Sequence, residues 1–167
     1  AAPVNYLLLP ATVSLAIPLY EKLDLLRKNA AAILAGITVG TLLSLGSAFV
    51  LALVLKLEHI QYVTLLPKSV TTAISMDVSA ELGGIAALTG AIVILTGIAG
   101  NLLAESVCKW FRITDPIAKG IGIGTSSHAI GTSKALEMGE VEGAMSGLAI
   151  AVAGVLTAVL CPIFAML

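Results

Sequence analysis

The chain has 167 residues, of which 58% are hydrophobic and only 11% are charged. A soluble domain usually carries about 25% charged residues, so this composition excludes a soluble globular protein and also a disordered one. The formal net charge of −1 provides no basic surface for nucleic acid, and Cys108 and Cys161 have no metal-ligand spacing. The composition therefore predicts an all-α polytopic membrane protein that holds no metal or cofactor.

Four charge-free runs have the length of a membrane-spanning helix, which needs about 20 apolar residues. The first run, Val4–Tyr20, contains two prolines and is therefore a weak or broken span. The other three are Ala30–Leu55, which is the clearest, Leu82–Ala104 and Gly143–Leu167. These runs predict at least three helices that cross the bilayer.

Two further apolar segments lie between the runs, and both are broken in the middle. His59–Met76 is interrupted by Pro67 and Lys68, and Pro116–Lys134 is interrupted by three glycines: Gly120, Gly122 and Gly124. Irregular backbone at membrane depth occurs only where it is buried in protein or lines a watery cavity. We therefore predict that the two segments form re-entrant helical hairpins and carry the function.

A shift of 56 residues aligns the two broken segments with each other. Ala73-Ile74 then falls on Ala129-Ile130, and Glu81-Leu82-Gly83 falls on Glu137-Met138-Gly139. Chance matching within an alphabet of Ala, Gly, Ile and Leu is the alternative explanation. One crossing helix and one hairpin per unit predict an inverted repeat, the plan of many secondary transporters. The units are a broken N-terminal membrane segment with a basic loop (1–29), repeat unit 1 (30–84), repeat unit 2 (85–142) and a C-terminal spanning helix (143–167).

The distribution of positive charge gives an independent indication of topology. Six of the nine Lys and Arg residues fall in two connecting segments that are separated by two crossings: Lys22, Arg27, Lys28, Lys109, Arg112 and Lys119. The two segments would therefore share one side of the membrane, which the positive-inside rule identifies as cytoplasmic.

Lys68 is the first candidate for a binding residue, because a charge at the bilayer centre costs about 2.5–3.5 kcal/mol. It stands next to Pro67 and ahead of a predicted helix, whose free N–H groups would help it attract a carboxylate. The alternative is a lysine that extends to the interface from a loop that does not re-enter the membrane.

His128 is the second candidate, and it lies between Gly124 and Gly131. A neutral imidazole can donate to a substrate oxygen, and a titrating one can carry a coupling proton. The alternative is a packed histidine bonded to a backbone carbonyl. The hydroxyls of both segments would bind a small polar ligand, unless they bond to carbonyls of their own helix. They belong to Ser69, Thr71, Thr72, Thr125, Ser126 and Ser127.

The acidic residues after the two segments permit two interpretations. Asp77, Glu81 and Glu137 would hold a proton or a cation, or they would simply mark where each hairpin returns to the interface. We expect Glu140 and Glu142 to be solvated.

Two other features of the sequence bear on function. Asn101 is a polar residue inside a span and is expected to bond to a neighbouring helix. Ser126-Ser127-His128 lacks the G-x-S-x-G elbow of a serine hydrolase, so we do not expect an enzyme.

Three motifs in this chain resemble the LrgB/CidB family of bacterial inner-membrane proteins. They are Leu9-Pro10-Ala11-Thr12-Val13, Leu66-Pro67-Lys68-Ser69-Val70-Thr71-Thr72 and Gly124-Thr125-Ser126-Ser127-His128-Ala129-Ile130-Gly131-Thr132. The chain also resembles the C-terminal part of the plastidial glycolate/glycerate translocator. Members of the family usually carry further helices before the first motif, so the chain resembles the C-terminal portion of a member or an unusually short one.

The resemblance implies a multi-pass protein of the bacterial inner membrane with one of two functions. One is transport of a small hydroxy- or keto-monocarboxylate of the pyruvate, lactate, glycolate or glycerate type, and the hairpin argument favours it. The other is an antiholin-like regulator of murein hydrolase export and autolysis. The expected partners are the small carboxylate, the lipid bilayer, a second copy of the chain and a small LrgA-type membrane protein.

Overall fold

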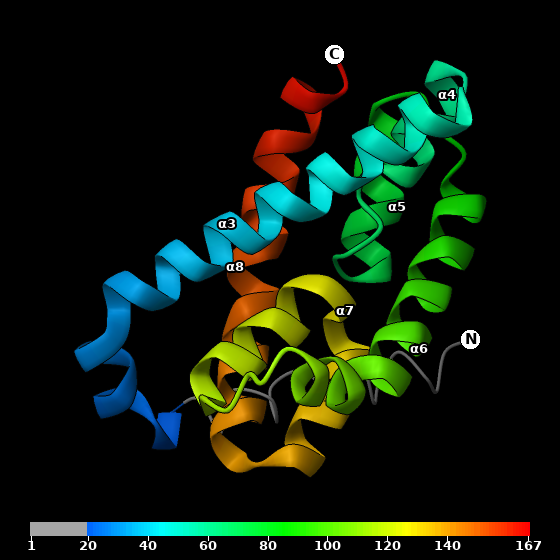
Figure 1. The fold of residues 1–167 in the computed structure, drawn as a ribbon. Helices are drawn as coiled ribbons and strands as arrows, with labels where there is room; N and C mark the ends of the chain where they lie inside the picture. Colours follow the sequence, from blue (N-terminus) through cyan, green and yellow to red (C-terminus); the bar gives the residue numbers. More distant parts are fainter. Residues whose placement is uncertain (1–19) are drawn as a thin grey trace, which may run out of the picture.

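The computed structural model describes residues 20–167, and this part of the chain consists of helices and short connections (Figure 1). In the described part six helices follow in order: α3 (Leu23–Leu55), α4 (His59–Leu65), α5 (Thr72–Glu81), α6 (Ala86–Trp110), α7 (Pro116–Met138) and α8 (Glu140–Phe164). The prediction of an all-α protein is confirmed. The predicted span Val4–Tyr20 lies outside the described residues apart from Tyr20 itself.

Three of the helices are long and apolar enough to cross a membrane: α3 from Asp24, α6 and α8. They correspond to the three clearer runs of the sequence. Large aliphatic side chains such as Leu43, Val54 and Leu95 are exposed on α3 and α6, as expected for helices surrounded by lipid. Re-entry of the two broken segments and the inverted repeat stay predictions.

The start of α3 differs from the basic loop expected there. The helix begins at Leu23, so Arg27 and Lys28 lie in its first turns. Just before it, the Lys22 ammonium donates to the Glu140 carboxylate at 2.9 Å and ties the start of α3 to the start of α8. This hydrogen bond and the negative charge of Glu140 raise the pKa of Lys22 above its usual value.

The segment His59–Met76 is broken where Pro67 and Lys68 predicted a break. Helix α4 ends at Leu65 and α5 begins at Thr72, and Figure 1 shows the turn between them directed toward α7. The buried Ser75 hydroxyl fastens this turn by donating to the Pro67 carbonyl at 2.6 Å. A proline at this point prevents a continuous helix, since it lacks the N–H donor and clashes with the preceding turn.

The segment Pro116–Lys134 is broken at a different place from the one expected. Its glycines are helical, and the break lies at His128, whose φ of 44° and ψ of −143° are not helical. Gly120 and Gly124 serve close packing on α8, because a Cβ at either position would lie 2.5 Å from a carbonyl oxygen of Glu142 or Ser146. The prediction that the glycines interrupt this segment is therefore wrong: two of them serve contact with a neighbouring helix, and at Gly122 nothing lies within 4 Å of the Cβ position.

Helix α7 is the centre of the described fold, and it packs against α8, α6 and α3. Its first half contributes Ile121 to an apolar cluster with the start of α3 and the middle of α8. A second apolar cluster joins the end of α3, α4, α5 and the end of α8. The two clusters hold the turn after α4 and the broken helix α7 in fixed positions near each other.

Candidate functional site

A cavity of about 420 Å³ brings the two broken segments together. Lys68 from the turn after α4 lines it, and so do Ser126 and Ser127 from α7. The remaining wall is largely apolar and comes mainly from α6, with Leu103 and Val107 among its residues, and Thr96 adds one more hydroxyl. The connection after α6 and the start of α7 complete the wall, and α7 adds a second charged residue, Lys119. A mostly apolar cavity with a few convergent polar groups is the usual form of a small-molecule site. We call it the inner cavity.

Lys68 is half-buried and has polar partners in its own turn. Its ammonium donates to the Ser69 hydroxyl at 3.2 Å, and this hydroxyl also accepts from Ser44 of α3 at 2.6 Å. Within residues 20–167 no carboxylate lies within ion-pair distance of Lys68. A partly buried charge with only a hydroxyl partner attracts an anion more strongly than a fully exposed charge does, since a lower dielectric strengthens the interaction.

The α7 hydroxyls are partly used by their own helix. Ser126 donates to the Gly122 carbonyl at 2.7 Å and lies 3.0 Å from the Ser127 hydroxyl. Thr125 donates to the Ile121 carbonyl at 2.8 Å and is buried against α3 rather than facing the inner cavity. Thr125 therefore follows the alternative in which the hydroxyl bonds only to its own helix. Ser126 and Ser127 also make local hydrogen bonds, but they line the inner cavity as well.

His128 occupies the break in α7 and is only 2% exposed. Its Nε2 donates to the Val93 carbonyl of α6 at 2.9 Å. The imidazole reaches this carbonyl because Gly97 leaves room for it: a Cβ on Gly97 would lie 2.6 Å from Cε1 of His128. His128 therefore has the carbonyl partner of a packed histidine and does not line the inner cavity.

The other predicted residues are distributed around this centre. Ser69 is buried beneath Lys68, and Thr71 and Thr72 begin α5 without lining the inner cavity. Asp77 and Glu81 are exposed along α5. Their assignment as coupling residues stays a prediction, and so does that of Glu137.

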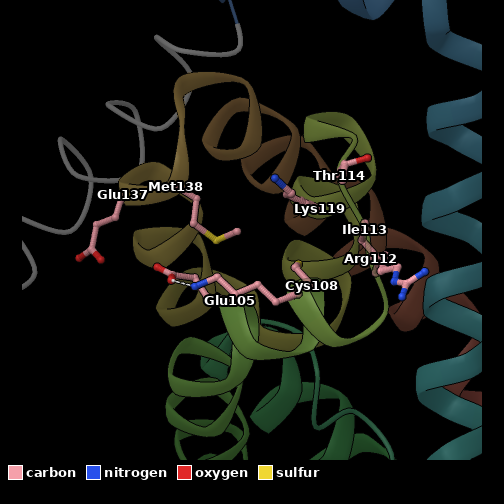
Figure 2. Close-up of a pocket in the computed structure, with 9 residues that line it drawn as sticks. Glu105, Cys108, Arg112, Ile113, Thr114, Lys119, Glu137 and Met138 are labelled. Atoms are coloured by element: carbon pink, nitrogen blue, oxygen red, sulfur yellow. Dashed lines mark ion pairs between the residues drawn. The ribbon is translucent and has the colours of Figure 1, made fainter.

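A second cavity of about 760 Å³ lies at the connection between α6 and α7, and we call it the outer cavity. Figure 2 shows Lys119 extending into it, whereas Glu137 lines its edge with the carboxylate pointing away from the other labelled side chains. Glu105 is paired with Lys109 at 3.5 Å and, outside this cavity, with Lys134 at 2.8 Å. The outer cavity also includes Arg112, so three basic residues of the sequence surround it.

Glu142 is not solvated, contrary to the expectation. It is 7% exposed, and its carboxylate lies 3.7 Å from the Lys119 ammonium. Gly120 lets α7 pack closely on α8 at Glu142, and this contact with the first turns of α7 buries the Glu142 side chain. Glu140 is exposed, as expected.

Lys119 was not among the site residues predicted from the sequence, and Asn101 was predicted only in part. Lys119 lines both cavities. Its helical spacing could have predicted this position, because Gly122, Ile123 and Ser126, at i+3, i+4 and i+7 on the same helix face, also line the inner cavity. Asn101 bonds to a neighbouring helix as expected, and its partner is the Ile130 carbonyl just after the break in α7, at 2.9 Å.

Comparisons with known proteins agree with the resemblance found in the motifs. The LrgB-like family matches residues 1–167. Two relatives named "Antiholin-like protein LrgB", from Bacillus cereus strain B4264 and Bacillus anthracis strain CDC 684, are each 40% identical over 161 residues, which is 96% of this chain and 70% of the relative. No solved structure matches. With a family match over its whole length and relatives at this identity, the chain belongs to the LrgB-like family of membrane proteins.

Proposed function

We propose that this chain forms the core of a secondary transporter for small hydroxy- or keto-monocarboxylates in the bacterial inner membrane. The observation that supports it is the inner cavity, in which Lys68 meets Ser126 and Ser127 from a second broken segment. The ammonium would bind the carboxylate, and the hydroxyls would bond to the hydroxyl or keto oxygen of the ligand. A cavity of about 420 Å³ accommodates an anion with three carbons.

The name of the relatives, "Antiholin-like protein LrgB", favours a second function, that of an antiholin-like protein. The family resemblance implies that such a protein regulates murein hydrolase export and autolysis. A regulator of this kind acts through assembly with other membrane proteins, including a second copy or a small LrgA-type partner. It has no need of a charged cavity inside the helices, so the role of Lys68 separates the two functions.

Uptake into proteoliposomes tests the transport function directly. The purified protein should accumulate at least one of pyruvate, lactate, glycolate and glycerate. Lys68→Ala should abolish this uptake while the protein remains inserted, and Lys68→Arg should be poorly active because a planar fork replaces a compact charge. Lys56→Ala, which removes an exposed charge that lines neither cavity, is the matched control.

The same variants distinguish the regulator. In a host that lacks its own LrgB-type protein, a pure regulator would restore control of lysis equally well with Lys68→Ala and with the native sequence. Wild-type uptake by Lys68→Ala would place the anion site elsewhere. Absence of uptake for every carboxylate, together with Lys68-independent control of lysis, would reject the transport function.

A further inference from the structure

We propose that small anions reach the inner cavity through the outer cavity, and that Lys119 is the anion-binding residue at their junction. The inference deepens the proposed function, since it rests on an anion site at Lys68. The entrance to the site would lie at the connection between α6 and α7. The ligand would be bound by two ammonium groups, those of Lys68 and Lys119.

The two cavities share part of their walls. Cys108, Ile113 and Lys119 line both, so the same side chains face the inner cavity on one side and the outer cavity on the other. Cys108 comes from α6, Ile113 from the connection and Lys119 from the first turns of α7. A ligand that moves from one cavity to the other would pass these three side chains.

The charges along this route favour an anion. Among the described residues that line the inner cavity, the charged ones are Lys68 and Lys119, and none is a carboxylate. Two carboxylates, Glu105 and Glu137, line the outer cavity together with three basic residues, and both carboxylates are already paired with lysines. The charged side chains of the inner cavity are therefore of one sign, and such a wall in a low dielectric raises the local concentration of the opposite ion.

The contact between Lys119 and Glu142 suits a residue that binds a passing ligand. Their separation of 3.7 Å is longer than a hydrogen bond, which spans about 2.7–3.2 Å between nitrogen and oxygen. The buried Glu142 therefore holds Lys119 in place without engaging its three N–H donors tightly. A carboxylate arriving from the outer cavity finds an ammonium that is positioned and has donors to offer.

Cys108 provides a native probe of the junction. Its sulfur would react with methanethiosulfonate reagents, displacing methanesulfinate and forming a mixed disulfide. We would compare the anionic sulfonatoethyl reagent with the cationic trimethylammonioethyl reagent on the full-length protein in liposomes. Each rate is divided by the rate of the same reagent with a free small thiol, and peptide mass mapping separates Cys108 from the fully buried Cys161.

We expect Cys108 to react faster with the anionic reagent than with the cationic one after this correction. The ratio of the two rates should change in opposite directions in two variants. Glu142→Gln should increase it, because Lys119 loses its counter-charge. Lys119→Gln combined with Glu142→Gln should decrease it, and this pair leaves no unpaired buried carboxylate to destabilise the fold. We expect the two variants to differ by about 10-fold in the ratio of rates. Lys28→Gln, an exposed lysine of α3 that lines neither cavity, should leave the ratio unchanged.

Three results would overturn the entry route: equal ratios in the two variants, a preference for the cationic reagent, or no reaction of Cys108 in a folded protein. The test is separate from the test of transport. Selective labelling that depends on Lys119, found in a protein without uptake, would support the route and refute transport. Uptake that requires Lys68, found with labelling that ignores Lys119, would support transport and refute the route.

Discussion

The close approach of His128 to α6 predicts that Gly97→Ala destabilises the protein. A Cβ at this position would lie 2.6 Å from Cε1 and 2.8 Å from Nε2 of His128, and 2.9 Å from Cβ of Ile130. All three are shorter than van der Waals contact, so the imidazole must move away from α6. Moving it also breaks the hydrogen bond from Nε2 to the Val93 carbonyl.

Three contributions determine the size of the effect. Overpacking of a filled interior costs about 1–3 kcal/mol. A buried hydrogen bond that is left unmade costs about 1–3 kcal/mol. Replacing glycine by alanine in a helix stabilises by about 1 kcal/mol, which acts in the opposite direction. The net expectation is a loss of about 1–5 kcal/mol in the free energy of unfolding.

Reversible unfolding of the protein in mixed micelles with increasing SDS, followed by far-ultraviolet circular dichroism, measures this loss. Gly46→Ala is the matched control, because Gly46 is also inside a helix and nothing lies within 4 Å of its Cβ position. It should be neutral or slightly stabilising. A double-mutant cycle with His128→Ala should show positive coupling of about 1–2 kcal/mol, since removing the ring removes the clash. Equal stability of the Gly97 and Gly46 variants would refute the reasoning.

Two further predictions concern the break in α7. Asn101→Leu should lower the free energy of unfolding by about 1 kcal/mol in the same assay, because the Ile130 carbonyl loses one of two side-chain donors and keeps the Ser133 hydroxyl at 2.6 Å; an unchanged unfolding curve would show that the Ser133 hydroxyl alone satisfies this carbonyl. His128→Gln keeps an N–H donor for the Val93 carbonyl but cannot titrate, so under proton coupling it should retain substrate exchange and lose accumulation driven by a pH gradient. Counterflow and pH-jump uptake on the same vesicles separate these two activities, and full retention of both would reject coupling through His128.

The elements of the fold were predictable where a local property of the chain determines them. The charge-free runs gave α3, α6 and α8, because a helix in lipid must be apolar over its whole length. The break at Pro67 was predictable for the same local reason, since proline cannot continue a helix. The position of Lys68 in a cavity followed from the cost of leaving a charge in lipid.

The parts that were not predictable depend on which helices become neighbours. Gly120 and Gly124 read as helix breakers, but in the structure they bring α7 close to α8. That contact buries Glu142 beside Lys119, two charges that are 23 positions apart and that the sequence placed in solvated connections. Neither the burial of the carboxylate nor the role of the lysine can be inferred before the packing of α7 on α8 is known.

Small residues of α6 explain why the two broken segments lie near each other. A Cβ at Gly90 would lie 3.1 Å from Sδ of Met76 and 3.7 Å from Cγ2 of Thr72, both in α5, and a Cβ at Gly97 would meet His128 of α7. Gly90 and Gly97 are seven residues apart, or two helical turns, so both contacts lie on the same face of α6. Thr72 and His128 are also the positions that the 56-residue shift superimposes. The two equivalent positions of the predicted repeat therefore contact one face of α6, two turns apart, and α6 is the common support of both segments.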